Sequence, residues 1–180
     1  TYDSAPKENE AAILALSIYA GHHRFANLVG DVQPIKGRAV RPRYKPVLKF
    51  RTDLSQHFIF SAAIKILSEQ GLSIAIGEFK ELMDRSDDGS GYSFVDLAAD
   101  FAGVQFAVVA TNKSTAIFVQ NRLTDITDEN VFFPKIEGLP EGLSKDDFTR
   151  VFTEVDSPEY LKMVRSIKQR IADLPIHQTH

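Results

Sequence analysis

The residues best suited to chemistry lie in one stretch near the middle of the chain, where carboxylates alternate with apolar groups. Glu78, Glu81 and Asp84 come late in one expected helix, and Asp96 and Asp100 open the next. Two carboxyl groups in unlike environments can have separated pKa values, so one acts as a general acid and another as base or electrostatic stabiliser. This chemistry predicts a hydrolase, with Glu81 or Glu78 as the acid and Asp96 or Asp100 as the base.

A histidine adds to these candidate catalytic residues. Asp53, His57 and Ser61 are spaced four residues apart, so they share one stripe of a helix. A catalytic serine is usually presented on a strained turn or a helix start, which argues against a relay here. We predict a local ion pair between Asp53 and His57, with His57 facing the carboxylates.

The same carboxylates have a structural interpretation. Ser93 and Asp96 form a capping box of the S-x-x-D type, which explains both residues without a function. Asp100 lies within an apolar helix, so we expect it to be partly buried and paired, holding packed helices together. Its candidate partners are Lys80, Arg85 and His57.

One loop has part of a calcium-binding pattern. Asp84, Ser86, Asp88 and Gly89 match the first half of an EF-hand loop, but Val95 stands where the bidentate glutamate is required. A polar turn is the simpler interpretation. The chain has no cysteine, which excludes thiolate metal sites. We therefore predict no metal and no cofactor.

A basic segment runs from Lys36 to Arg51, with seven basic residues and no acidic one. An anionic envelope component is the expected partner, whereas nucleic acid is the weakest candidate because no accompanying motif is present. Alternatively, the segment folds over residues 124–159, which hold ten acidic and three basic residues. Alternation over residues 47–51 predicts a short edge strand. The candidate anion-binding residues are Arg38, Arg41, Arg43 and Lys45.

Helical periodicity dominates the rest of the chain. Helices are expected over residues 4–29, 53–70, 72–85, 94–110, 112–124, 144–153 and 157–174. This pattern predicts an all-α fold, a compact bundle of six or seven helices with a short extended segment near residues 36–51. We expect a helical core domain over residues 1–126 and a C-terminal helical extension over residues 127–180 packed on it.

Composition sets few limits on function. The 180 residues are 43% hydrophobic and 25% charged, with a net charge of -3, which is ordinary for a globular protein. The apolar runs that stand out span about ten residues, against roughly 20 needed to cross a bilayer, so no transmembrane segment is predicted. Because the chain begins with Thr1, we expect that an upstream piece was removed, for which a signal peptide or lipid anchor is one candidate.

Part of the chain resembles a known family. The matching pieces are Asp53 with His57-Phe58, Lys80-Glu81-x-x-Asp84, and Gly89-x-Gly91-Tyr-Ser93-x-x-Asp96-Leu-x-Ala99-Asp100-x-x-Gly103. Over residues 50–107 they resemble the YfiM-like family of predicted bacterial envelope lipoproteins, although Gln56 replaces an expected lysine. The resemblance implies a compact helical fold and a periplasmic or envelope location, and it brings no known reaction.

Two main functions follow. The first is a non-catalytic, envelope-associated protein whose buried polar cluster joins helices and whose basic segment contacts an anionic partner. The second is a hydrolase acting on an envelope polymer or lipid. Carboxylates sealed inside the bundle favour the first, and an open site favours the second.

Overall fold

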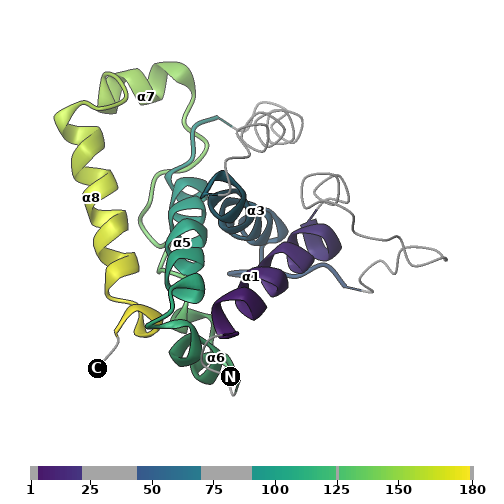
Figure 1. Cartoon of the computed structure of the whole chain (residues 1–180). Coiled ribbons are helices and arrows are strands. Elements are labelled where there is room, and N and C mark those ends of the chain that lie inside the picture. The colour runs from purple at the N-terminus through teal and green to yellow at the C-terminus, as the bar shows by residue number, and fades with distance from the viewer. Residues whose placement is uncertain (1–3, 22–43, 70–90, 125, 179–180) are drawn as a thin grey trace.

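The computed structural model describes residues 4–21, 44–69, 91–124 and 126–178, and it confirms the all-α prediction (Figure 1). The helices described are α1 (Ala5–Leu16), α3 (Thr52–Glu69), α5 (Phe94–Thr111), α6 (Ala116–Thr124), α7 (Lys145–Phe152) and α8 (Pro158–Ala172). A π-helical turn, η1 (Ser17–Gly21), extends α1, and 3-10 turns form η3 (Glu129–Val131) and η4 (Pro175–His177). Within these residues there is no β-strand, only two isolated bridges.

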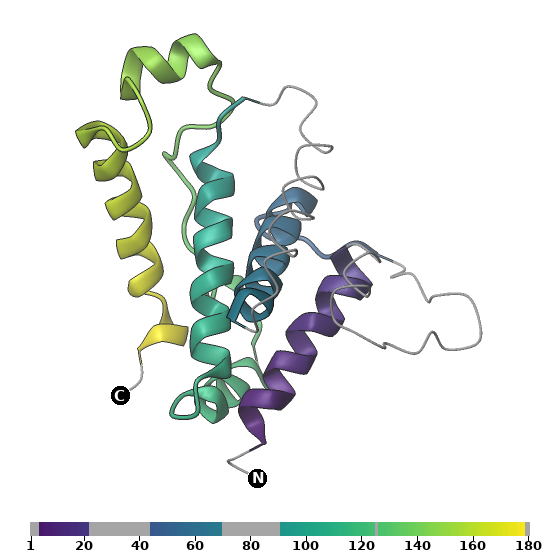
Figure 2. The same cartoon turned by 45° about the horizontal axis from the view of Figure 1, so that its top comes forward.

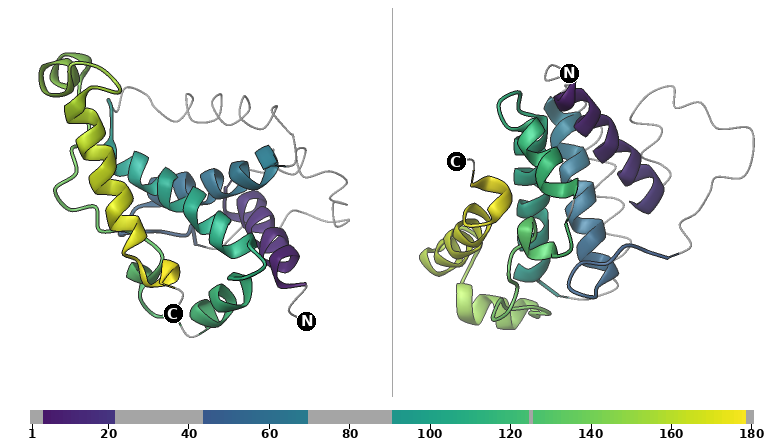
Figure 3. Two further views of the ribbon diagram at one scale, coloured as in Figure 1. Left: turned by 60° about the vertical axis from the view of Figure 1, so that its left-hand side comes forward. Right: turned by 90° about the horizontal axis from the view of Figure 1, so that it is seen from below.

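Helix α5 is the centre of the bundle. It packs along α3, while α8 and α1 lie on opposite sides of it (Figures 2 and 3). Its buried face carries small side chains, which let neighbouring helices approach closely. These buried residues include Ala98, Ala99, Ala102, Gly103, Ala107 and Ala110.

The closest approach of α3 and α5 is at Gly103. A Cβ atom built on this glycine would lie 2.1 Å from the carbonyl oxygen of Phe58, a distance that packed atoms never reach. Any larger residue would therefore push the two backbones apart. Phe58 and Phe106 pack beside this contact, with ring centroids 5.4 Å apart. Gly103 thus sets the spacing of the central helix pair.

A single amide ties α1 to the far end of α5. The side-chain amide of Asn9 donates to the carbonyl oxygens of Ala110 (2.7 Å) and Ala116 (3.1 Å). Gln120 in turn donates to the side-chain oxygen of Asn9 (3.0 Å). The Asn9 amide therefore satisfies a carbonyl that the end of α5 leaves open. Of the helix expected over residues 4–29, the part beyond residue 21 lies outside the described residues.

The C-terminal residues pack on the central pair through aromatic side chains. Phe133 is fully buried, and its ring lies 6.0 Å from that of Phe58. Phe94, also fully buried, contacts Phe152 at 4.7 Å between ring centroids. The backbones of Tyr92 and Leu143 exchange two hydrogen bonds (2.8 and 3.0 Å) just before α5. The predicted boundary between residues 126 and 127 stays a prediction.

Two local predictions need correction. The edge strand expected over residues 47–51 is a tight turn, in which Leu48 and Arg51 exchange backbone hydrogen bonds of 2.9 Å. The alternation of apolar and basic residues does not follow burial, since Leu48 is buried and Phe50 is exposed. The helix expected from residue 112 begins at Ala116, because Asn112 closes a turn through its side chain. The helix expected over residues 72–85 lies outside the described residues.

Helix α5 also bears on the prediction of no transmembrane segment. It is long and apolar enough to cross a membrane by length and composition, and half of it is buried inside the protein. The sequence analysis missed it because Asp96 and Asp100 interrupt its apolar residues. The core helix of a globular protein passes the same test, and the packing of α5 on α3 is of that kind.

Replacing Gly103 tests the close approach. We expect Gly103→Ala to lower the free energy of unfolding by about 3 kcal/mol or more, since neither backbone can yield without repacking the core. Gly138 has a φ of +76° and open space around its Cα. Gly138→Ala should therefore cost only the backbone strain, about 1 kcal/mol. Equal midpoints for the two variants in denaturant melts would contradict this account.

Candidate functional site

The polar cluster predicted from the sequence forms where the N-terminal halves of α3 and α5 meet. Two side chains of α3 contact the same carboxylate oxygen of Asp100, which lies in α5. The Ser61 hydroxyl donates to Asp100 Oδ1 (2.7 Å), and His57 Nδ1 lies 3.1 Å from the same atom. Ser61 is 6% exposed, whereas the Asp100 side chain is 29% exposed. Asp100 is thus partly buried and paired, and His57 is confirmed among its predicted partners.

The order of these contacts matters for the chemistry. In a catalytic triad the serine hydroxyl donates to the histidine, which is held by the carboxylate. Here Ser61 donates directly to Asp100, and Asp53 accepts a hydrogen bond from Arg51 and not from His57. The predicted ion pair between Asp53 and His57 is therefore replaced by two separate pairs. The arrangement supplies no activated serine.

Asp96 occupies the same face one turn earlier. Its backbone N–H donates to Ser93 Oγ (3.0 Å), which confirms the predicted cap of α5. Its carboxylate lies 3.9 Å from His57 Nε2 and 3.8 Å from a guanidinium nitrogen of Arg51, and Oδ1 is buried without a hydrogen bond. Burial raises the pKa of Asp96, although His57 and the bond with Ser93 oppose the shift.

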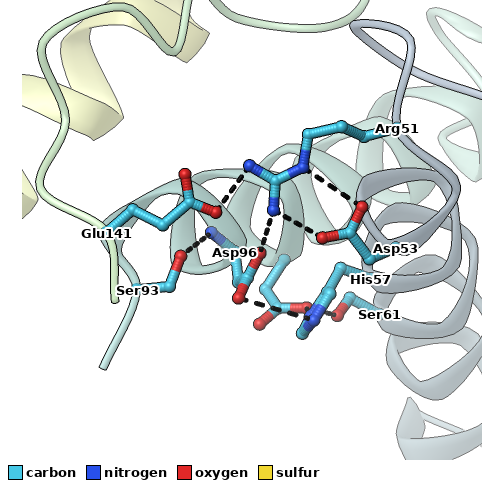
Figure 4. A network of polar contacts seen from close by, with 8 residues as sticks. Arg51, Asp53, His57, Ser61, Ser93, Asp96 and Glu141 are labelled. Atoms are coloured by element: carbon cyan, nitrogen blue, oxygen red, sulfur yellow. Dashed lines mark hydrogen bonds and ion pairs between the residues drawn. The ribbon is translucent and has the colours of Figure 1, made fainter. Parts of the chain in front are cut away.

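Arg51 joins the carboxylates of three segments, as Figure 4 shows. Its guanidinium contacts Asp53 (2.5 Å), Glu141 (2.5 Å) and, at 3.8 Å, Asp96. The hydrogen bond from Arg51 lowers the pKa of Asp53. Bonding to Asp53 and Glu141 raises the pKa of Arg51, against the effect of burial. Arg51 therefore stays charged and links the start of α3 to α5 and to the loop before α7.

The sequence analysis located part of this site. His57, Asp96 and Asp100 lie together as predicted, whereas Glu81 and Asp84 lie outside the described residues. The roles of Arg51 and Glu141 were missed. The excess of acid in residues 124–159 was the available signal, since Glu129 likewise pairs with Lys49 (3.6 Å). The end of the basic segment therefore does meet the acidic part of the chain.

The predicted anion-binding residues are only partly described. Lys45 is exposed, and it makes no ion pair with any residue of the described ranges. Arg38, Arg41 and Arg43 lie outside those ranges, as do Lys80, Arg85 and most of the calcium-like loop. In the described part of the chain, no group of three or more histidine and carboxylate side chains could hold a metal ion.

Comparisons with known proteins assign no family. No protein-family model, curated protein or solved structure matches the chain. The resemblance of residues 50–107 to the YfiM-like family stays a prediction.

Removing the Asp100 carboxylate tests its structural role. Asp100→Ala leaves the buried Ser61 hydroxyl and the His57 ring without their acceptor, so we expect a loss of about 1 to 3 kcal/mol in the free energy of unfolding. Asp100→Asn should cost less, because its amide oxygen still accepts from Ser61. The double variant with Ser61→Ala should cost less than the sum of the single changes. An Asp100→Ala midpoint at or above the parent's would show that Asp100 is held at a cost to the fold, as active-site groups are.

The raised pKa of Asp96 predicts a pH dependence. A carboxyl whose pKa is raised by folding stabilises the fold below its unfolded pKa, about 3.9, and this stabilisation is lost as the pH rises through the folded value. The variant Asp96→Asn stays neutral throughout. Its free energy of unfolding relative to the parent should therefore increase between about pH 3.5 and about pH 7. Asp146→Asn, in the exposed first turn of α7, serves as the control. A relative stability of Asp96→Asn that falls over this range would contradict the direction of the shift.

Proposed function

We propose that this protein is a non-catalytic, envelope-associated helical protein whose polar cluster joins helices and whose basic segment contacts an anionic partner. The proposal that the polar cluster joins helices rests on Asp100 Oδ1, which two side chains of α3 contact. Both groups of α3 that could have served a nucleophilic reaction, Ser61 and His57, meet that one oxygen. They connect α3 to α5 where a catalytic arrangement would connect the serine to the histidine.

The Arg51 contacts support the same interpretation. One guanidinium is shared by carboxylates of α3, α5 and the loop before α7, so it links three segments. Removing one partner of such a network leaves an uncompensated charge, which destabilises the fold. The network therefore holds the three segments in one arrangement. Nothing in this arrangement requires a substrate.

A hydrolase is the second candidate, and Asp96 favours it. A carboxyl whose pKa is raised by burial, with an oxygen that lacks a hydrogen bond, is suited to donate a proton. The cluster is also open to solvent in part, since the Asp96 side chain is 22% exposed and that of Asp100 is 29% exposed. Asp96 would be the acid and Asp100 the base in this alternative, with an envelope polymer or lipid as substrate.

The anion contact is proposed for the part of the basic segment that precedes Lys49. Lys49 and Arg51 are neutralised by Glu129, Asp53 and Glu141. Residues 36–45 hold five further basic residues and no acidic one. Lys45 of this group is exposed. Five positive charges within ten residues attract an anionic surface, and the resulting association weakens as the salt concentration rises.

Neutralising four of these residues tests the anion contact. The variant Arg38→Ala, Arg41→Ala, Arg43→Ala, Lys45→Ala should lose most of its retention on heparin, a soluble polyanion, and its sedimentation with phosphatidylglycerol vesicles. The control variant removes as much charge from exposed sites elsewhere: Lys113→Ala, Lys145→Ala, Lys162→Ala, Arg165→Ala. Binding of the parent should weaken steeply with salt. Equal binding by the two variants would overturn the proposed role of the basic segment.

A further inference from the structure

Phe50 is the most exposed large apolar side chain in the described part of the chain, at 98% exposure. Two other apolar side chains precede it in the same short segment, Tyr44 at 78% and Val47 at 49%. Exposed apolar residues scattered singly are ordinary, whereas three within residues 44–50 gather apolar surface on one short segment, called the patch below. Lys45 lies within it and is exposed as well. The patch therefore combines apolar side chains with positive charge.

The backbone that presents Phe50 is strained. Lys49 and Phe50 form the middle of a two-residue turn, and both have positive φ, 51° and 61°. Such turns strongly favour asparagine and glycine, because other side chains clash with the backbone there. Because the phenylalanine is fully exposed, its side chain gains no packing energy that would offset this strain. Strain that the fold does not use is found at positions that serve a function.

The base of the turn is fixed. Leu48 is buried at 7% exposure, and it exchanges two backbone hydrogen bonds with Arg51. The Lys49 N–H donates to the carboxylate of Glu129 (3.0 Å), and Lys49 Nζ donates to Asn130 (2.5 Å). Arg51 is held by Asp53 and Glu141. Phe50 is therefore held outward by contacts on both sides of it.

We propose that Tyr44, Val47 and Phe50 form a docking tip that enters the interfacial layer of an anionic lipid bilayer, with Phe50 at its point. This inference deepens the proposed function, on which it rests, by identifying the anionic partner as a lipid surface. Aromatic residues beside basic ones are the composition that binds at this layer, where rings reach the acyl boundary and cations meet headgroups. The aliphatic Val47 favours lipid over a polysaccharide or nucleic acid, which aromatic groups bind by stacking.

The chain lacks tryptophan, so Phe50→Trp introduces a single reporter at the tip. With vesicles of phosphatidylglycerol and phosphatidylcholine, we expect its emission to shift to shorter wavelength and to be quenched by brominated lipid. Val151→Trp on α7, a residue that is 50% exposed, should show neither change. Vesicles of phosphatidylcholine alone should leave both variants unchanged.

A second variant separates docking from folding. Phe50→Gly relieves the positive φ and removes no packing, so its denaturation midpoint should equal or exceed the parent's. Its affinity for the anionic vesicles should fall about tenfold, the effect of losing one aromatic anchor. Phe50→Gly binding as tightly as the parent would overturn the proposal.

The outcomes distinguish the docking tip from the function on which it rests. Salt-dependent sedimentation of Phe50→Trp with anionic vesicles, without an emission shift, overturns the tip and leaves the anion contact in place. Retention on heparin without vesicle binding does the same. Loss of both kinds of binding in the parent overturns both proposals. Self-association that Phe50→Gly abolishes would assign the patch to a second copy of the chain and overturn the lipid assignment.

Discussion

The contact between Gly103 and the backbone of Phe58 determines how the rest of the molecule is placed. It brings α3 and α5 to backbone distance, and a helix pair so close has a fixed register. His57 precedes Phe58, and Asp100 lies nearly one turn before Gly103, so the same contact places the histidine ring opposite the carboxylate. The polar cluster is thus a consequence of the packing of Gly103 against the backbone of Phe58.

Around this contact, two carboxyl groups near the same arginine have opposite pKa shifts. Asp53 is hydrogen-bonded to Arg51, which lowers its pKa. Asp96 lies 3.8 Å from the same guanidinium without a hydrogen bond, and its burial raises its pKa. The difference comes from geometry, because a charge-assisted bond offsets burial and a slightly longer contact does not. A structural network can therefore shift the pKa values of neighbouring carboxyl groups in opposite directions.

The sequence predicted the features that depend on local spacing. Ser93 caps α5 by accepting a hydrogen bond from the Asp96 N–H, as predicted. The expected starts of α1, α3, α5, α7 and α8 lie within one residue of the observed ones. Contacts between distant residues were harder to predict. His57 was one of three candidate partners of Asp100, because burial of the Asp100 carboxylate requires a partner but does not determine which residue it is.

Other features were missed for physical reasons. Arg51 and Glu141 are far apart in sequence, and no local rule brings them together. Gly103 entered the sequence analysis only as part of a motif, because no local pattern shows which helix a glycine faces. The turn at Lys49 and Phe50 contradicts the residue preferences of such turns, so alternation favoured a strand. Local preference fails there, at the position proposed to serve a function.

The amide of Asn9 has a consequence for the order in which the chain is built. Its two acceptors, the carbonyls of Ala110 and Ala116, lie 101 and 107 residues further along the chain. A ribosome that has just released α1 has yet to make the surface on which that helix rests. The partners α3 and α5 are much nearer to each other in sequence and can pair first. Helix α1 is therefore synthesised before α3 and α5 but docks after they have paired, and until then its apolar face needs protection from other nascent chains.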